Sequence, residues 1–457
     1  MVMATTMDTP GRAPLLRYAM QALAALLFMV MASTLASAQE DEPNVAVVRG
    51  GKVEPINIAI SPFLAGAGAE DVAATVAGVV ANDLARSGYF NPLSPESFIE
   101  RISDFEQQPN FMSWRQVQAR GLVTGQVYMD GGKLRVAFKL FDVNTGNLLA
   151  GQSFSASPKL ARRLAHRMAD QIYKALTGFD GYFDTRIVYV DESGPKSQRV
   201  KKLAIMDQDG FNPRTLPVGG DLLLTPRFSP TANEVTFLSF GSGVPRVFIY
   251  NIDTNQREIV GDFPNMSFAP RYSPDGNRVI MSLQSDDGAY SNLFEMNLQT
   301  RQLRQLTKVA AINTAPSYSP DGANIAFESD RGGSQQIYVM PAGGGEAQRI
   351  SFGKGRYSTP VWSPDGQWIA FTKNAGGKFA IGVMRPNGQG ERILTEGYHN
   401  EGPTWSPNSR VIMFFRESGG GEGGGPQLYS VDVTGYNEQK VPTPEFASDP
   451  AWSPRLN

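Results

Sequence analysis

The sequence lacks several residue types that would indicate particular functions. None of its 457 residues is a cysteine, which excludes disulfide bonds, thiol nucleophiles and cysteine-ligated zinc. Only two residues are histidines, His166 and His399. An excess of one charge is also missing, because 42 Lys and Arg residues face 44 Asp and Glu residues and the net charge is -2. The chain therefore has no electrostatic footprint for a nucleic acid partner.

A hydrophobic run long enough to cross a membrane is absent as well. The apolar stretch near the N-terminus covers 22–32, which is well below the roughly 20 residues that span a bilayer. Arg12 and Arg17 precede it, and Ala36-Ser37-Ala38 provides a small-residue cleavage site. This pattern predicts a secretory signal peptide at 1–38, and therefore an exported protein with no membrane span in the mature chain.

What the sequence does contain is a repeated motif. A proline, a spacer residue, an aromatic residue and Ser-Pro recur six times, at intervals of 43 to 47 residues. A period of this length indicates stacked copies of one supersecondary unit, because a single copy cannot bury its own apolar face. The six copies begin at Pro226, Pro270, Pro316, Pro360, Pro403 and Pro450.

Each repeat has the pattern of four β-strands. Two runs of alternating apolar and polar residues follow the motif, and a polar run that ends in an aliphatic residue closes the unit. The tetrad Ser-Pro-Asp-Gly, which three copies contain, fits a type I turn with Pro at the second place and Gly at the fourth. Four strands per repeat are typical of a β-propeller blade.

The two ends of the repeat array predict how the propeller closes. Residues 186–216 supply three strand runs with no Ser-Pro strand before them, whereas 450–454 supply a Ser-Pro strand without the runs that should follow. Each end holds the part that the other lacks. We therefore expect six blades at 181–457, five of them continuous and one assembled from both ends, which removes the open sheet edges.

A second domain is predicted at 54–180, after an extended segment at 39–53. An apolar strand at 56–61, a helix with Val76 and Leu84 on one face, and a three-stranded meander within 122–155 make up its first part. A closing amphipathic helix follows, with Leu160, Leu164, Met168, Ile172 and Leu176 on its apolar face. The predicted fold is an α+β N-terminal domain followed by an all-β six-bladed β-propeller.

The chain resembles the TolB family, the WD40-like propeller proteins of the periplasmic Tol-Pal system. The resemblance depends on the signal peptide, a small α+β domain that ends in YKALTGFDGYFDTRIVYV (173–190), and six blades of the Ser-Pro-Asp-Gly type. It implies a periplasmic protein that binds other proteins, maintains outer-membrane integrity and supports constriction during cell division. It also implies that the protein is not an enzyme, so we expect no catalytic residue, no cofactor and no metal ligand.

The resemblance implies two protein partners. In the family, the outer-membrane lipoprotein Pal binds at one mouth of the propeller channel, which is formed by the loops before the first strand of each blade. Met266 stands where related proteins carry a histidine. The residues carried over to this mouth are Met266, Phe268, Ala269, Asn313, Thr314, Tyr357, Ser358, Thr359, His399, Asn400 and Glu401.

The second implied partner is TolA of the inner membrane. In the family, the N-terminal segment either docks on the protein or is released to engage TolA, so that it reports whether Pal is bound. Here the segment would present Val45, Val47 and Val48 as its apolar face. Other outer-membrane proteins are further expected partners.

Two other functions stay open from the residues alone. One is a periplasmic propeller that binds another protein or a glycan. The other is a propeller-linked hydrolase, which needs a G-x-S-x-G elbow and a later histidine; the nearest stretch, 151–155, begins Gly-Gln-Ser but ends in Ser155 on a predicted strand. We expect His166 to be an ordinary helix residue and His399 to be a polar contact to a partner. Asp207-Gln208-Asp209-Gly210 is expected to be a plain turn, because no Glu completes a calcium loop.

Overall fold

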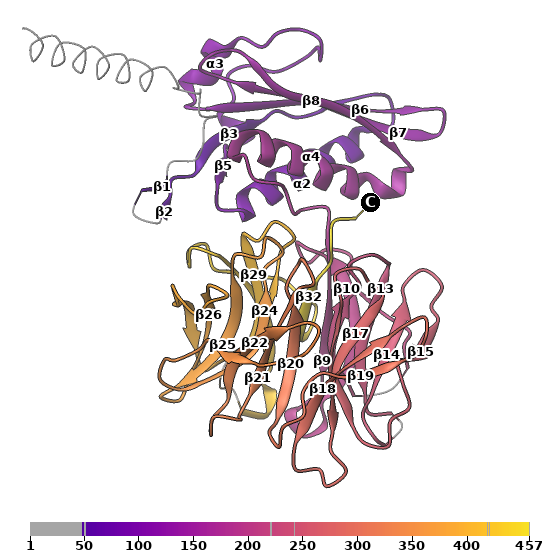
Figure 1. Ribbon diagram of the computed structural model, residues 1–457. Coiled ribbons are helices and arrows are strands. Elements are labelled where there is room, and N and C mark those ends of the chain that lie inside the picture. Colours follow the sequence, from indigo (N-terminus) through magenta and orange to yellow (C-terminus); the bar gives the residue numbers. More distant parts are fainter. Residues whose placement is uncertain are drawn as a thin grey trace, which may run out of the picture. The chain divides into compact units, whose positions relative to one another are not determined.

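The computed structural model describes residues 48–49, 52–219, 222–241, 243–417, 419 and 421–456. The predicted signal peptide and most of the segment 39–53 lie outside these described residues. An N-terminal region of helices and one mixed sheet is followed by six four-stranded sheets (Figure 1). The predicted fold class, an α+β domain followed by a six-bladed β-propeller, is therefore confirmed. Among the described residues, no helix is long and apolar enough to pass through a bilayer.

The N-terminal domain is built on a sheet with the strand order β5-β3-β6-β7-β8. Its first three strands pair in parallel around β3, and β6, β7 and β8 form the predicted antiparallel meander. The strands are β3 (Ile56–Ile60), β4 (Leu64–Ala65, paired with β6), β5 (Phe90–Pro92), β6 (Gly121–Asp130), β7 (Lys133–Asp142) and β8 (Leu148–Ala156). Before the sheet, β1 (Val48–Arg49) pairs with β2 (Lys52–Val53).

Two helices, α2 (Glu70–Arg86) and α4 (Ala161–Thr177), cover one face of this sheet (Figure 1). Their apolar faces form one core with the sheet, because a helix with a single apolar stripe must bury it against another layer. Leu160 is an exception to the prediction. It precedes α4 as the N-cap residue, at the end of the 3-10 turn Pro158–Leu160, and is 40% exposed. The short helix α3 (Phe111–Gln116) was not predicted.

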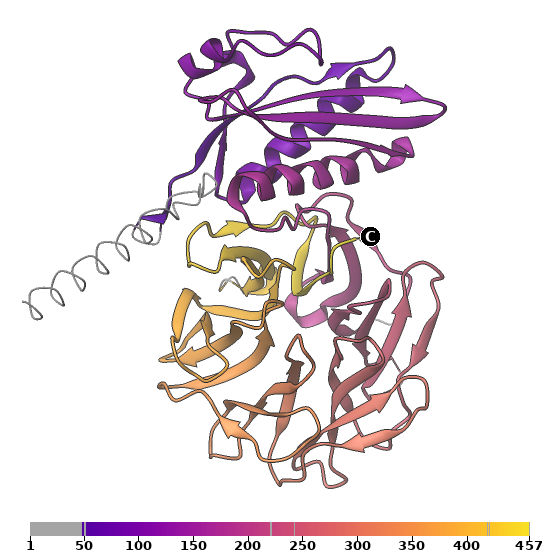
Figure 2. The same cartoon turned by 45° about the horizontal axis from the view of Figure 1, so that its top comes forward.

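The propeller consists of six sheets, which Figure 2 shows arranged as blades around a central axis. In five blades the strands follow one another in chain order. These blades are β12 (Leu223–Phe228), β13 (Glu234–Ser239), β14 (Arg246–Asn251) and β15 (Arg257–Ile259); β16 (Ser267–Tyr272), β17 (Arg278–Gln284), β18 (Ser291–Asn297) and β19 (Leu303–Gln305); β20 (Asn313–Tyr318), β21 (Asn324–Ser329), β22 (Gln336–Pro341) and β23 (Gln348–Arg349); β24 (Arg356–Trp362), β25 (Ile369–Ala375), β26 (Lys378–Met384) and β27 (Arg392–Gly397); and β28 (His399–Trp405), β29 (Val411–Glu417), β30 (Pro426–Asp432) and β31 (Gln439–Lys440).

The remaining blade is assembled from both ends of the repeat array. It has the order β11-β10-β9-β32, in which β9 (Arg186–Ser193), β10 (Val200–Asp207) and β11 (Arg214–Thr215) come from one end and β32 (Phe446–Trp452) from the other. The predicted closure is confirmed. A hydrogen bond outside the β-ladder also holds the two ends together: the backbone N–H of Arg186 donates to Ser453 Oγ at 2.9 Å.

The Ser-Pro turns have the predicted hydrogen bond. In the turn of the second copy, the N–H of Gly276 donates to the carbonyl of Ser273 at 2.9 Å. Gly276 has a φ of +72°, a value that favours glycine. The corresponding glycines of the next two copies, Gly322 and Gly366, make the same bond at 2.9 Å with φ values of +71° and +74°.

A β-bulge interrupts the innermost strand of every blade. The residue before the motif proline has a positive φ in each case, and the pairing register with the second strand shifts there. A bulge of this kind turns the local peptide group out of the ladder. The six residues with positive φ are Thr225, Ala269, Ala315, Thr359, Gly402 and Asp449.

The connection between the two domains is held by hydrogen bonds. Asp170 of α4 accepts from the backbone N–H groups of Phe183, at 2.7 Å, and Asp184, at 3.2 Å. Arg163 donates to Asp184 at 3.1 Å, and Tyr182 and Phe183 are buried in the core that both domains share. The linker is therefore tied to the closing helix along its length.

Replacement of Trp452 should test the closure of the ring. Its indole Nε1 donates to Thr185 Oγ1 at 2.8 Å, its ring packs edge-on against Tyr182, and it is 7% exposed. We expect Trp452→Ala to lower the free energy of unfolding by about 3–5 kcal/mol, because it leaves a cavity at the seam. Chemical unfolding followed by tryptophan fluorescence and circular dichroism measures this loss.

The matched control is Trp368→Ala, because Trp368 is only partly buried and lies away from the seam against Arg385 and Arg392. It should cost roughly 1 kcal/mol. Equal losses in both variants would contradict a special role of the seam.

Candidate functional site

The predicted partner-binding residues come together at one mouth of the propeller. Phe268 and Ala269 lie on β16, Asn313 and Thr314 lie on β20, and the other members of the set lie on β24 and β28, while Met266 directly precedes β16. These innermost strands belong to consecutive blades and contact one another. All of the residues stand at or before the bulge, whereas the Ser-Pro turn follows it at the other end of the strand. They therefore occupy the same end of the channel.

Three members of this set are buried inside the blades. Asn313 and Tyr357 are 0% exposed, and so is Asn400. Asn313 donates from Nδ2 to the carbonyl of Ser291 at 2.9 Å, and Asn400 Oδ1 accepts from Arg416 Nε at 2.8 Å. These side chains shape the loops of the mouth but offer no surface to a partner.

The other eight members of the set are partly exposed. They are Met266, Phe268, Ala269, Thr314, Ser358, Thr359, His399 and Glu401. Two of them are fixed by the bulge, because the positive φ of Ala269 and Thr359 places both in the unpaired position of their strands. The mouth thus presents small, apolar and charged side chains on a backbone whose conformation is already set.

His399 is held between two acidic and two aromatic side chains. Its Nε2 lies 2.9 Å from Glu401 Oε2, and its Nδ1 lies 3.6 Å from Glu417 Oε2. The ring centroids of Phe379 and Phe415 are 4.7 and 5.6 Å away. The hydrogen bond with Glu401 raises the pKa of His399, and the charges of both glutamates act in the same direction against partial burial. This arrangement favours a positive imidazolium at the mouth.

Two further carboxylates accept hydrogen bonds from bulge residues and were not among the residues predicted for the mouth. Burial raises the pKa of Glu328 to about 7, although the N–H of Thr359 donates to its Oε2 at 3.4 Å. Burial also raises the pKa of Asp449, whose Oδ2 accepts from the N–H of Thr225 at 3.3 Å. The charge of Glu401 acts on both groups. No sequence signal marks them as a pair, because Glu328 lies on β21, the second strand of its blade, whereas Asp449 lies on β32, the innermost strand that closes the ring.

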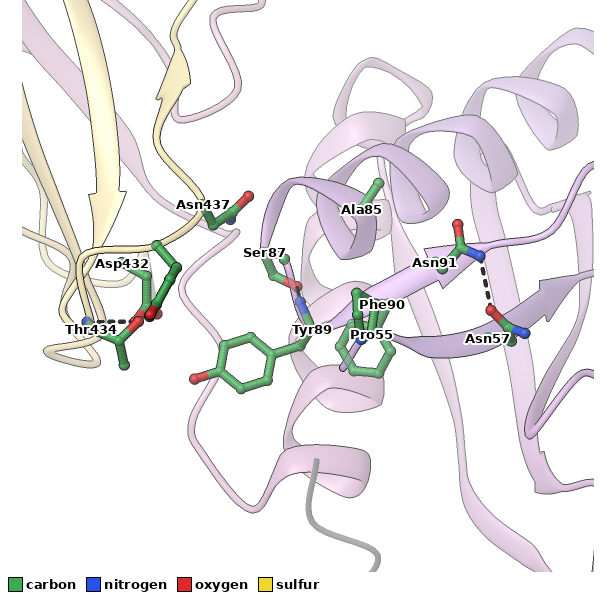
Figure 3. A pocket seen from close by; sticks show the side chains of 12 residues that line it. Pro55, Asn57, Ala85, Ser87, Tyr89, Phe90, Asn91, Asp432, Thr434 and Asn437 are labelled. Carbon is green, nitrogen blue, oxygen red and sulfur yellow. Dashed lines mark hydrogen bonds between the residues drawn. The ribbon is translucent and has the colours of Figure 1, made fainter. Parts of the chain in front are cut away.

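A cavity of about 650 Å³ lies where the N-terminal domain meets the last continuous blade. Figure 3 shows Tyr89, Phe90 and Pro55 on one side of it and Asp432 and Asn437 on the other. Hydrogen bonds across the join hold its walls together. Asn437 Nδ2 donates to the carbonyl of Arg86 at 2.9 Å, and Arg410 donates to the hydroxyl of Tyr89 at 2.7 Å. The sequence could not reveal this cavity, because the residues bonded across the join are more than 320 positions apart.

His166 and the turn Asp207–Gly210 also meet at the join between the domains. His166 lies on α4 and Asp207–Gly210 forms a turn, as expected, but both make buried polar contacts that were not predicted. His166 Nδ1 on α4 lies 2.6 Å from Asp83 Oδ2 on α2. Gln208 Nε2 donates to the other oxygen of this carboxylate, Asp83 Oδ1, at 2.8 Å. The ligand atoms of His166, Asp207 and Asp209 lie within 4.8 Å of one another.

These three residues have the chemistry of metal ligands, but their charges are already compensated. Arg162 Nη2 donates to Asp209 Oδ2 at 2.5 Å, and Arg162 Nε donates to Asp207 Oδ2 at 3.4 Å. A bound cation would have to displace this guanidinium. The cluster therefore acts as a polar connection between the α2–α4 pair and the first blade.

The histidine of this cluster is charged over a wide range of pH. Burial by itself lowers the pKa of His166, but the charge of Asp83 and the hydrogen bonds with Asp207 and Asp83 raise it to about 10. Burial also raises the pKa of Asp83, and the charge of His166 opposes that effect. The pair is buried on both sides, since the two side chains are 4% and 0% exposed.

Comparisons with known proteins agree for both domains. The model of the TolB amino-terminal domain matches residues 44–149, and the model of the TolB beta propeller domain matches residues 173–456. A crystal structure of TolB from Acinetobacter baumannii is similar, with 28% sequence identity and a TM-score of 0.76. That similarity covers 88% of this chain and 97% of the other. Hydrazine synthase from Kuenenia stuttgartiensis matches with 15% identity and a TM-score of 0.48 over 60% of this chain and 48% of its own.

The His166 pair should make the stability of the protein depend on pH. A group whose pKa is higher in the folded than in the unfolded state stabilises the fold fully below its unfolded pKa of about 6.5 and loses this effect as the pH rises towards 10. We expect His166→Gln to cost about 3 kcal/mol at pH 6, and progressively less at pH values between about 7 and 10. The measurement is the free energy of unfolding of both proteins at several pH values.

His399→Gln serves as the control, because His399 is partly exposed and its charge is screened by solvent. A cost of His166→Gln that stays constant with pH would show that packing, and not the charge, is what the histidine contributes.

Proposed function

Because this chain belongs to the TolB family, we propose that it is a periplasmic scaffold of a Tol-Pal system that binds the lipoprotein Pal at the mouth of its propeller. The observation that supports this most directly is the mouth itself. Four consecutive blades present Phe268, Thr314, Ser358 and His399, with their neighbours, as one partly exposed surface. TolB-like propellers are generally not enzymes, and binding is the activity that such a surface supports.

The mouth is suited to binding a globular partner with little rearrangement. Its strands are fixed by the ladders of the blades, its loops by buried side chains such as Asn313 and Asn400, and its bulges by the motif prolines that follow them. A surface that is already ordered loses little conformational entropy on binding. His399 and Glu401 add a charged pair at the rim, which favours correct orientation of a partner more than affinity.

The proposed second partner is TolA, which the N-terminal segment would bind. Val45 and Val47 of its predicted apolar face lie outside the described residues, and Val48 begins β1. Pro55, which follows this segment, lines the 650 Å³ cavity at the join of the domains. In this proposal the segment either docks on the protein or is released to engage TolA. The protein would thereby connect the outer-membrane lipoprotein to the inner-membrane Tol complex, with further outer-membrane partners, and support envelope integrity and constriction during division.

A charged residue at the centre of the mouth should abolish Pal binding. Thr314 lies on β20, directly before the bulge, and its side chain is partly exposed. In Thr314→Arg, a long cation would occupy the space of a small side chain and would be desolvated at the interface, so we expect at least a hundredfold weaker binding. Isothermal titration calorimetry with purified Pal measures this effect.

Thr75→Arg is the matched control, since Thr75 is exposed on α2, far from the mouth in the fold, and arginine is compatible with a helix. It should bind Pal like the unchanged protein. If the unchanged protein itself does not bind Pal, the proposed function is wrong.

Deletion of residues 39–53 should separate the two partners. We expect the truncated protein still to bind Pal, because the mouth is formed by the propeller alone, and to lose binding to TolA. Calorimetry with each purified partner tests this. Retained TolA binding would place that partner elsewhere on the protein.

A further inference from the structure

Two arginines lie at the end of the channel opposite the proposed Pal mouth. They occupy the same motif position in two neighbouring blades. Arg227 and Arg271 each follow the motif proline of their blade, on the innermost strands β12 and β16. The strands contact each other. Both arginines line a cavity of about 340 Å³ to which the innermost strands of all six blades contribute. In the other four blades the same position is Ser317, Val361, Thr404 or Ala451.

Two of the four neutral residues at this position accept hydrogen bonds within the wall of the channel. Ser317 Oγ accepts from the backbone N–H of Trp362 at 3.0 Å, and Thr404 Oγ1 accepts from the backbone N–H of Trp452 at 3.1 Å. A guanidinium cannot make such a bond, because it has five N–H donors and no acceptor. Arginine at two of the six positions therefore brings donors to a place where two other blades use acceptors and two have apolar side chains.

The protein itself supplies few acceptors to these two side chains. Among the residues that the structure describes, Arg227 Nη1 has one hydrogen bond, to the carbonyl of Pro226 at 2.6 Å, and Arg271 has no side-chain hydrogen bond or ion pair. Asp449 is the acidic group whose charge acts on Arg227. Burial lowers the pKa of Arg271, and the charge of Arg227 lowers it further. Two like charges thus face one partly enclosed space.

The rest of the cavity wall is aromatic and apolar. It contains the motif aromatics Phe228, Tyr272, Tyr318, Trp362, Trp405 and Trp452 together with several prolines of the Ser-Pro turns. A wall of this kind excludes water from the charged groups and strengthens their attraction for an anion. Guanidinium groups match the geometry of carboxylate and phosphate oxygens, which accept two parallel hydrogen bonds.

We propose that this cavity is a binding site for a small anionic ligand, with Arg227 and Arg271 binding its carboxylate or phosphate group and the aromatic wall receiving its body. The ligand would neutralise the repulsion between the two guanidinium groups and satisfy their donors. The site is separate from the Pal mouth, because the bulge and the carboxylates of Glu328 and Asp449 lie between them along the strands. It is therefore independent of the proposed function.

Two probes distinguish the sources of the negative charge. Inorganic phosphate carries the oxyanion alone, and benzoate carries a carboxylate on a flat apolar body. Their binding to the purified protein is measured by calorimetry in Tris-chloride buffer at constant ionic strength. We expect saturable binding of at least one probe, and at least tenfold weaker binding in Arg227→Gln and in Arg271→Gln.

Thermal unfolding provides a second readout that a purely structural role would not produce. Without a probe, Arg271→Gln should unfold at a higher temperature than the unchanged protein, because it removes a repulsive charge from the cavity. With the probe, the unchanged protein should gain stability that the variant does not gain.

Arg120→Gln is the control for loss of one positive charge, since Arg120 is exposed in the N-terminal domain. It should leave probe binding unchanged. The proposal is overturned if neither probe binds to the unchanged protein, or if binding survives in Arg271→Gln. A loss of binding in Arg120→Gln as large as in Arg271→Gln would overturn it too, because the effect would then be one of net charge alone.

Discussion

The pairing of β32 with β9 is the interaction on which the rest of the propeller depends. It joins strands that are about 260 residues apart, with Ser448 opposite Val190 and Trp452 opposite Ile187. Because one strand of the first blade arrives last, the ring is complete only when all six blades are in place. Completion leaves no open edge between the first and the last blade. The same closure brings Trp452 against Thr185 and Tyr182, so the seam of the ring and the linker to the N-terminal domain are packed as one core.

The bulge in each innermost strand is the second constraint, and it divides the channel into two zones. Six residues with positive φ stand at one level, and the peptide groups they turn out of the ladders donate to carboxylates at two places, Glu328 and Asp449. Above that level lie the small, apolar and acidic groups of the mouth. Below it lie the residues that follow the motif prolines, including Arg227 and Arg271. The bulge thus separates two surfaces of different charge. The pairing register with the second strand changes at the bulge, so the side chains before it and after it are positioned independently.

The two domains are joined by polar groups as well as by apolar packing. Asp83 and His166 are buried together on the helices, and Gln208 of the first blade bonds to the same carboxylate. On the other side of the join, Asn437 and Arg410 bond to the end of α2 and to Tyr89. Buried polar groups tolerate few alternative positions, because each misplaced group loses its partner in a medium of low dielectric constant. This network favours one arrangement at the join and leaves a cavity of defined walls beside it.

The sequence by itself determined the strands of the blades, the Ser-Pro turns, the number of blades and the way the ring closes. These features depend on alternation, turn chemistry and a period of fixed length, all of which are local or repetitive. Leu160 shows the limit of the local pattern, since the apolar spacing continued into a residue that the helix does not include. Only the tertiary structure decided which mouth residues are exposed, burying Asn313, Tyr357 and Asn400, and which charged groups meet, as His166 does with Asp207 and Arg227 with Arg271. The physical reason is that burial and charge pairing depend on the register of neighbouring strands, on bulges and on contacts between domains, and none of these is encoded in a single stretch of the chain.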